Sequence, residues 1–303
     1  MLICMQGGIN MVESINQICK NLAEELNLTS MEHNKISTGF VDLDNLFGEG
    51  LNNKPNLICL AACPAMGKTT MALDIALNTA MSSGKDVYIF SLELSKEQAV
   101  DMLLIKMCGF NGRYILRNKG ELTDVMKYKI SSALKTLSEL NIFIYDECYL
   151  TVNDIKSKIK EIDKTALIVI DYLQLMSVEK DTDVSQVLHQ NQRTIEMEIL
   201  IKDLAALTKE INIPIVAVTQ IRRFTADRND RRPLMSDLGL EALEREPDTI
   251  IMLYRDYKVR GSWTRGFGHD VLSDDTELFV HKNRYGNLGT IKINFNQQFL
   301  KFE

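Results

Sequence analysis

The sequence predicts an α/β fold in which a mostly parallel β-sheet is flanked by helices and closed at one edge by an antiparallel C-terminal hairpin. From residue 36 onward, short and continuously apolar segments alternate with longer segments of helical periodicity, which indicates parallel strands buried on both faces. Near the C-terminus this alternation gives way to short strands with tight connections, which is typical of antiparallel hairpins. A Gly-Lys-Thr turn also stands between the first apolar strand and the first long helix.

The expected elements follow one another in a regular order. Buried strands are expected at 57–61, 87–91, 142–145, 167–170, 215–219 and 250–254. Helices are expected between them at 70–82, 96–108, 121–141, 152–163 and 193–211. Ser95 and Gln98 have the spacing of a capping box at the start of the second helix. The closing strands are expected at 277–281, 289–295 and 299–302.

The first 35 residues differ from the rest. Residues 10–27 carry a narrow apolar stripe at helical spacing, and the polar stretch 29–35 follows. An amphipathic helix must bury its stripe, either on its own core or on a neighbouring subunit. We therefore expect a leader with an amphipathic helix at 1–35 and one α/β domain at 36–303.

Composition narrows the classes of protein. The 303 residues are 45% hydrophobic and 25% charged, as in ordinary globular chains. The net charge of −6 means that any contact with nucleic acid must be local. The six cysteines form no C-x-x-C pair, which favours reduced thiols in a reducing compartment. Without a signal peptide or a membrane-spanning apolar run, we expect a cytoplasmic protein with no membrane partner.

The stretch after the first strand has the pattern of a phosphate-binding loop. Backbone N–H groups in such a turn point at phosphate oxygens, and the following helix N-terminus adds partial positive charge. Lys68 would reach the outer phosphates and the Thr69 hydroxyl would bind Mg²⁺. The alternative is a chance Gly-Lys-Thr loop, which the flanking strand and helix oppose. The expected nucleotide-binding residues are Ala62, Cys63, Pro64, Ala65, Met66, Gly67, Lys68, Thr69 and Thr70.

Three polar residues end other buried strands and would lie at the same edge of the sheet. Asp171 is the candidate magnesium ligand, although an aspartate there could simply cap a turn. Glu93 is the candidate base for the attacking water, and its alternative is a solvated loop acid. Gln220 could sense the γ-phosphate, but a glutamine at a strand end is more often a loop residue.

Two groups of cations lie further on. Arginines crowd the loop after Gln220 and could contact nucleic-acid phosphates, an acidic partner, or only neighbouring aspartates. Lys282 and Arg284 are two apart at a strand end, so both can face one anion. They are candidates for an arginine finger that completes a neighbour's site, or ordinary hairpin cations. The loop arginines are Arg222, Arg223, Arg228, Arg231 and Arg232.

Together these motifs resemble the motor domain of DnaB-type replicative helicases, which are RecA-like P-loop NTPases. The matching segments lie in the family's order across roughly residues 36 to 303. They are Ser37-Thr38-Gly39-Phe40, Leu43-Asp44, the Ala-first phosphate loop, Phe90-Ser91-Leu92-Glu93, Ile170-Asp171-Tyr172-Leu173-Gln174-Leu175-Met176, Gln220, Arg232-Pro233, Met235-Ser236-Asp237-Leu238, Tyr254-Arg255-Asp256 and Lys282-Asn283-Arg284-Tyr285-Gly286.

The resemblance implies a function and partners. It implies an ATP- and Mg²⁺-dependent DNA helicase motor, a homo-oligomer in the form of a hexameric ring, that threads single-stranded DNA through its centre. It makes Glu93 the catalytic base, Asp171 the metal-binding acid and Gln220 the γ-phosphate sensor. Lys282 and Arg284 would then act on the adjacent subunit's site. A helicase loader or other replication proteins are further expected partners.

Three departures from the family's pattern bear on these expectations. Residues 1–35 resemble only the family's linker helix, so primase binding is not expected. The family's Asp-Leu-Arg-Glu-Ser-Gly is replaced by the run from Asp237 to Glu241, which lacks the arginine. The insertion at 258–275 has no assigned role and is expected as a surface loop. Two alternatives therefore stay open: an ATP-switched scaffold that binds single-stranded DNA without unwinding, and a recombinase-like filament former.

Overall fold

The structure is a computed structural model of the 303-residue chain. It describes residues 36–48, 50–51, 56–110, 122–179, 189–221, 228, 230–255 and 273–303, which belong to one compact unit, Lys35–Glu303. The helix expected at 10–27 and most of the insertion expected at 258–275 lie outside the described residues.

A nine-stranded sheet in the order β3-β2-β4-β5-β1-β6-β7-β8-β9 runs through the described part of the chain. Its first six strands pair in parallel, as their continuously apolar sequences predict. β1, β4 and β6 are buried along their whole length. The parallel strands are β1 (Leu57–Ala62), β2 (Asp86–Ser91), β3 (Ile142–Tyr145), β4 (Thr165–Asp171), β5 (Ile215–Gln220) and β6 (Thr249–Arg255).

The closing edge of the sheet is antiparallel, as expected. β7 (Ser273–Asn283) pairs with β6 and β8 (Gly289–Asn296), and β9 (Lys301–Phe302) pairs with β8. The expected strand at 299–302 is wrong in its first half, because residues 297–300 form the turn from β8 into β9. Leu300 ends this turn with φ +48°, so it leaves the extended conformation that a strand needs.

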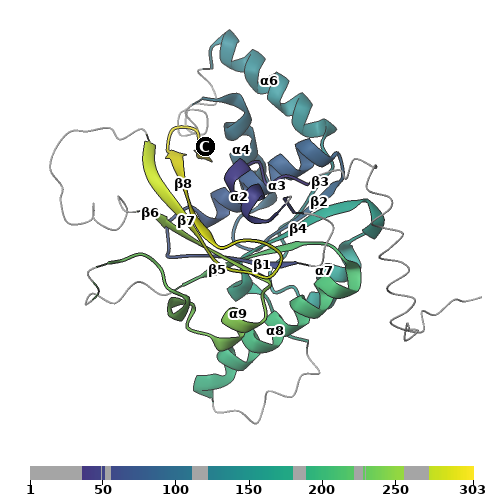
Figure 1. Ribbon diagram of the computed structural model, residues 1–303. Coiled ribbons are helices and arrows are strands. Elements are labelled where there is room, and N and C mark those ends of the chain that lie inside the picture. Colours follow the sequence, from purple (N-terminus) through teal and green to yellow (C-terminus); the bar gives the residue numbers. More distant parts are fainter. Residues whose placement is uncertain are drawn as a thin grey trace, which may run out of the picture. The chain divides into compact units, whose positions relative to one another are not determined.

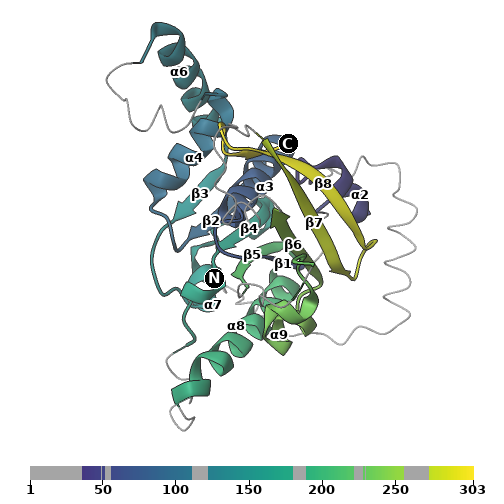
Figure 2. The ribbon, with the colours of Figure 1, turned by 90° about the vertical axis from the view of Figure 1, so that its left-hand side faces the viewer.

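Helices cover both faces of the sheet (Figure 1, Figure 2). One face carries α2 (Val41–Leu46), α3 (Lys68–Ser83) and α4 (Lys96–Cys108), and α6 (Asp124–Glu139) projects from α4. The other face carries α7 (Val152–Lys158), α8 (His189–Ile211) and α9 (Glu241–Arg245). Short 3₁₀ turns are η1 (Ile162–Lys164), η2 (Leu173–Leu175) and η3 (Met235–Leu238).

Local sequence signals predict the start of α4 correctly and the end of α7 wrongly. The capping box of Ser95 and Gln98 at the start of α4 is confirmed. The helix expected at 152–163 is wrong beyond Lys158, because Ile159 is extended at φ −79° and ψ 109° and buries its side chain. Burial of that one isoleucine in the core prevails over the helical periodicity of the sequence.

Two further findings concern composition. Cys59, Cys63, Cys108 and Cys148 take part in no disulfide, and burial raises the pKa of Cys59 to about 12. Within the described ranges, every helix is too short or too polar to cross a membrane.

Candidate functional site

Four neighbouring strands deliver the predicted site residues to one edge of the sheet. β2, β4, β5 and β1 are adjacent and parallel. Their register places Ser91 beside Asp171, and Ala62 beside Gln220. The backbone N–H of Leu92 donates to the carbonyl of Asp171 at 2.7 Å, which ties the loop of Glu93 to the end of β4. The carboxyl ends of parallel strands are where open α/β sheets bind ligands.

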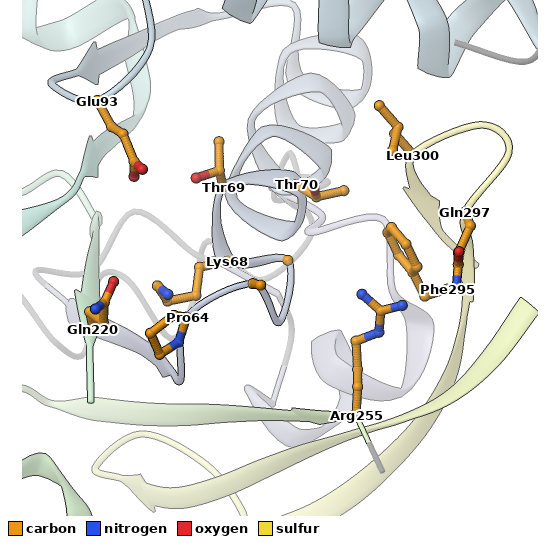
Figure 3. Close-up of a pocket in the computed structure, with 12 residues that line it drawn as sticks. Pro64, Lys68, Thr69, Thr70, Glu93, Gln220, Arg255, Phe295, Gln297 and Leu300 are labelled. Carbon is orange, nitrogen blue, oxygen red and sulfur yellow. The ribbon is translucent and has the colours of Figure 1, made fainter. Parts of the chain in front are cut away.

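A pocket of about 380 Å³ opens at this edge, within the usual size of small-molecule sites. Figure 3 shows Lys68 in its middle, with Glu93 and Gln220 on one side and the side chains of Arg255 and Phe295 on the other. The pocket is lined by Pro64, Ala65, Gly67, Lys68, Thr69, Thr70, Glu93, Gln220, Arg255, Phe295, Gln297 and Leu300.

The loop between β1 and α3 has the backbone shape that phosphate binding requires. Gly67 precedes α3 with φ +100°, and a Cβ atom there would lie 3.0 Å from Cζ of Phe302. Glycine is therefore needed at this position both for its backbone conformation and for space. Among the described residues no side chain caps the first turn of α3, and that turn contains no acidic residue. The backbone N–H groups of that first turn are therefore available to bind an anion in the pocket.

Lys68 sits in an electrostatic environment matched to a polyphosphate. Its ammonium donates to the carbonyl of Cys63 at 3.1 Å, so the carbonyl holds the charge over the loop. Burial lowers the pKa of Lys68, while the charges of Asp171 and Glu93 oppose that shift. A half-buried cation beside an open helix N-terminus favours a ligand of high negative charge.

Asp171 is suited to hold a divalent cation. Burial is the main cause that raises the pKa of its carboxyl to about 6; the negative charge of Glu93 adds to the shift, and the Thr69 hydroxyl bond and Lys68 oppose it. One oxygen, Oδ1, is buried without a hydrogen-bond partner among the described residues. These residues hold no cluster of three or more metal-ligating side chains. A single carboxylate with a hydroxyl fits Mg²⁺, which binds through few protein ligands together with phosphates and water.

Replacing Asp171 with asparagine should stabilise the nucleotide-free protein. The folded carboxyl keeps its proton to about pH 6, whereas the unfolded one loses it near 3.8, so its contribution to stability falls as pH rises between these values. We expect the free energy of unfolding of the Asp171→Asn variant at pH 8 to exceed wild type by up to about 3 kcal/mol, with no difference near pH 4.

Urea unfolding between pH 4 and 8 measures this difference. The exposed Asp163→Asn serves as the control and should show no comparable pH dependence. Equal stability of the Asp171→Asn variant and wild type at pH 8 would contradict the assigned burial of the charge.

Sequence reasoning missed one residue that organises the site. Gln174 donates to Thr219 Oγ1 at 2.9 Å and to the carbonyl of Gln220 at 3.1 Å, and it accepts from the N–H of Gln220 at 3.4 Å. It therefore fixes the end of β5. The available signal was its place three residues after Asp171 in the segment that resembles the helicase family.

The wall of the pocket opposite Glu93 was also missed. Arg255 ends β6 and is 2% exposed, with its guanidinium 3.9 Å from the ring centre of Phe295 on β8. Gln297 and Leu300 follow in the turn after β8. Only the Tyr254-Arg255-Asp256 segment had been noted in the sequence, and without a role. These residues lie far from the loop in sequence. Arg255 reaches the pocket from the end of β6, beside β1, and the others reach it from the antiparallel strands and their turn.

Lys282 and Arg284 do not reach this pocket. Arg284 donates through Nη1 to Oδ1 of Asp248 at 2.9 Å, and its N–H donates to the carbonyl of Asp248 at 3.0 Å. Lys282 donates to the carbonyls of Glu244 at 2.9 Å and Arg245 at 2.6 Å. Burial is the main cause that lowers the pKa of Lys282, and Arg284 adds to it.

The contacts of Asp248 show near which end of the parallel strands Lys282 and Arg284 lie. Its Oδ2 accepts from the N–H of Leu57 at 3.0 Å, and Leu57 begins β1. The phosphate loop follows the other end of that six-residue strand, about 20 Å away. Arg284 therefore lies near the N-terminal ends of the parallel strands, whereas the pocket lies at their C-terminal ends. Its side chain cannot reach its own chain's phosphate loop.

The arginines predicted to contact nucleic acid are in part engaged within the chain. Arg228 donates to both carboxylate oxygens of Asp237, at 3.3 and 2.9 Å. Arg232 donates to both oxygens of Glu277, at 2.7 and 3.1 Å. Arg231 is half-buried, and Arg222 and Arg223 lie outside the described residues. Contact of these five with nucleic acid stays a prediction.

The fold and the pocket define a class of protein. A strand that runs through a glycine turn into a helix, with acidic residues at the ends of neighbouring parallel strands, is the architecture of RecA-like P-loop ATPase domains. Residues 35–303 match the family model "DnaB-like helicase C terminal domain". The chain belongs to that family.

Curated relatives carry replicative helicase names. The chain is 34% identical over 303 residues to "Replicative DNA helicase DnaB" of Buchnera aphidicola subsp. Baizongia pistaciae, covering 98% of this chain and 61% of the relative. It is 32% identical over 272 residues to the protein of the same kind from Geobacillus stearothermophilus, covering 88% of this chain and 56% of that one. The chain thus spans less than two thirds of the length of these relatives.

Solved structures agree with the fold. The structure titled "The Structure Of A DnaB-Like Replicative Helicase And Its Interactions With Primase" matches with a TM-score of 0.79 at 28% identity, over 96% of this chain and 66% of that chain. A separately solved ATPase domain matches with a TM-score of 0.80 at 28% identity, over 95% of this chain and 98% of that domain. The predicted RecA-like core with an antiparallel C-terminal edge is confirmed.

Proposed function

We propose that this chain is the ATP-hydrolysing motor of a replicative DNA helicase, which translocates on single-stranded DNA and unwinds duplex. Membership of the DnaB-like family and the names of its relatives support this reading. The pocket supports it independently, because it offers a helix N-terminus, a lysine and a carboxylate–hydroxyl pair where a triphosphate with Mg²⁺ needs them.

Each pocket residue then has a role. Lys68 and the first-turn N–H groups of α3 hold the outer phosphates. Thr69 and Asp171 hold Mg²⁺, which supplies neutralisation of the phosphate charge. Glu93 orients the attacking water and accepts its proton, because its carboxylate lines the pocket and faces Lys68 (Figure 3). Gln220, whose backbone is bonded to Gln174, presents its side chain to the γ-phosphate.

One observation carries the proposal that the active unit is an assembly of several copies. Arg284 and Lys282 lie at the ends of the parallel strands that are opposite their own chain's pocket. A head-to-tail contact between copies would bring these strand ends against the next subunit's phosphate loop, and repetition of that contact gives a closed ring or a helical filament. We propose a homo-oligomeric ring, a hexamer in keeping with the resemblance, in which Arg284 and Lys282 act in trans.

The remaining assignments follow from this motor. Residues 36–303 are the motor domain, and 1–35 supply a linker-like helix that docks on the neighbouring copy. Single-stranded DNA runs along the loops after Asp171 and Gln220, with Arg222, Arg223, Arg228, Arg231 and Arg232 as the candidate contacts. A helicase loader or other replication proteins are further partners.

A forked-duplex assay tests this function. With ATP and Mg²⁺, the wild-type protein should separate the strands and hydrolyse ATP faster when single-stranded DNA is present. The Lys68→Ala variant should do neither, since it loses the cation that binds the outer phosphates. A wild-type protein that binds ATP but is as inactive as this variant, on forks of either polarity, would contradict helicase activity.

A specific observation favours a second candidate, an ATP-switched scaffold that binds single-stranded DNA without unwinding. Arg228 and Arg232 are held by Asp237 and Glu277 within the chain, so this loop offers less charge to a moving DNA strand. ATP-dependent DNA binding in a stable assembly without unwinding would favour the scaffold. Strand exchange together with open helical particles in electron microscopy would instead indicate a recombinase-like filament.

A further inference from the structure

Lys106 of α4 is a buried cation with three defined partners. Its side chain is 1% exposed and that of Asp74, on α3, is 3% exposed. The ammonium donates to Asp74 Oδ1 at 2.7 Å, to the carbonyl of Thr70 at 3.2 Å and to the carbonyl of Leu300 at 2.6 Å. An ammonium has three protons, so these contacts use all of them.

Asp74 completes the connection to the end of the sheet. Its other oxygen, Oδ2, accepts from the N–H of Phe302 at 3.1 Å. The pair therefore binds the backbone of residues 300 and 302 from both sides of one turn. The ring of Phe302 packs directly against Gly67 of the phosphate loop, and Leu300 lines the pocket.

Lys106 joins α4 to two elements that line the pocket, α3 and the turn after β8. α3 carries Lys68 and Thr69 in its first turn, α4 follows the loop of Glu93, and the turn after β8 supplies Gln297 and Leu300. Figure 3 shows Glu93 on one side of the pocket and Gln297 and Leu300 on the other, with Thr69 of α3 between them. One buried ammonium thus connects parts of the chain that are almost 200 residues apart.

A buried ion pair is a costly way to fill a core. Two desolvated charges are often no more stabilising than well-packed apolar residues of similar volume. Apolar side chains, however, could not bind the carbonyl of Leu300 or the N–H of Phe302. The specific gain from this pair is therefore the position of the 300–302 backbone relative to the first turn of α3.

We propose that Lys106 and Asp74 act together as positioning residues of the nucleotide pocket, holding the 295–302 wall at a set distance from the phosphate loop. This inference rests on the proposed function. Lys68 and Thr69 bind phosphates, so the opposite wall, with Phe295, Gln297 and Leu300, faces the nucleoside. The pair therefore governs affinity for the nucleoside part of ATP and leaves binding of the phosphates unchanged.

The double variant Asp74→Leu/Lys106→Met separates this role from stability. It replaces the pair with apolar residues of similar size, so the fold should be retained, while both backbone bonds to residues 300 and 302 are lost. We expect the KM for ATP to rise about tenfold, the value of two lost hydrogen bonds of ordinary strength. kcat at saturating ATP should stay near wild type. Competition by inorganic tripolyphosphate with Mg²⁺, which has no nucleoside, should be unchanged.

Three further variants show whether a change in the KM for ATP is caused by misfolding. Lys106→Met leaves Asp74 buried and unpaired and should unfold at lower temperature; adding Asp74→Leu should restore the unfolding temperature but not the KM. Asp74→Asn keeps the shape, but its one carbonyl oxygen can accept from Lys106 or from the Phe302 N–H only, so we expect about a threefold rise in KM. The exposed Lys135→Met is the matched control.

The outcomes are distinct. Wild-type KM in both the double variant and Asp74→Asn would overturn the proposal, as would equal losses of ATP and tripolyphosphate binding, which indicate a general distortion. If the wild-type protein binds tripolyphosphate and ATP equally well, the 295–302 wall does not contact the nucleoside and the proposal fails while the phosphate site stands. If the wild-type protein binds neither, the proposed nucleotide function itself fails.

Discussion

Replacing Arg284 with alanine should reduce ATP turnover by the assembled protein by roughly 10³-fold or more, as for other NTPases that lose an arginine supplied in trans. Affinity for ATP in the separated protomer should not change. The reason is geometric: Arg284 pairs with Asp248 at the opposite edge of the sheet from its own phosphate loop. Steady-state hydrolysis above and below the concentration at which copies assemble, with ATP binding measured in parallel, gives both quantities.

A mixing experiment decides whether Arg284 acts on a neighbour. The Arg284→Ala variant keeps an intact pocket, and Glu93→Gln keeps an intact Arg284. When the two inactive proteins are mixed and reassembled at random, about a quarter of the head-to-tail interfaces combine an intact pocket with an intact arginine. Hydrolysis should therefore reappear in the mixture.

The control for this experiment is Lys292→Ala, which removes an exposed cation from the same antiparallel edge, outside the pocket lining. It should be active alone. Thermal unfolding of the Arg284→Ala variant must also be measured, because Asp248 is 4% exposed and loses its cation. A folded, assembled Arg284→Ala protein with wild-type turnover would show that the hairpin cations are structural.

Replacing Glu93 with glutamine should lower the rate of ATP hydrolysis by roughly 10²- to 10⁴-fold, the usual effect of losing a general base. Binding of ATP should be retained or strengthened, because the amide removes a negative charge from the phosphate side of the pocket. Glu93 lies in the loop between β2 and α4, where its carboxylate faces Lys68 (Figure 3). Single-turnover hydrolysis with a fluorescent ATP analogue for binding separates the two effects.

Glu97→Gln is the matched control for this second variant. Glu97 is an exposed acid in the first turn of α4, four residues along the chain, and it contacts Ser95 and lies outside the pocket lining. Its replacement should leave hydrolysis near wild type. If Glu93→Gln hydrolyses ATP at the wild-type rate while Lys68→Ala does not, the base is another group and the role given to Glu93 is wrong.

The parallel part of the sheet could be predicted because its signals are local. β1, β4 and β5 carry continuous apolar runs; β4 and β5 each end in a polar residue, and β1 leads directly into the phosphate loop, so the strands and the strand ends that carry the site can be predicted from short windows of sequence. The end of α7 could not, because Ile159 leaves the helix to fill the core. The turn before β9 is longer than the tight connection expected after Asn296: the side chain of Asn296 accepts from the N–H groups of Gln298 and Phe299 within it, and Lys106 from α4 binds the carbonyl of Leu300.

The sequence by itself determined the phosphate loop, its helix and the residues that end the neighbouring strands, because these features depend on spacing over a few residues. The tertiary structure decided the rest of the pocket. Phe295 and Leu300 reach it only because the antiparallel edge folds back over Gly67, and Arg255 reaches it from the end of β6, which pairs with β1. The tertiary structure also decided that Arg284 lies at the ends of the parallel strands opposite the pocket, since strand order depends on how the whole sheet buries its faces. No local pattern specifies that order.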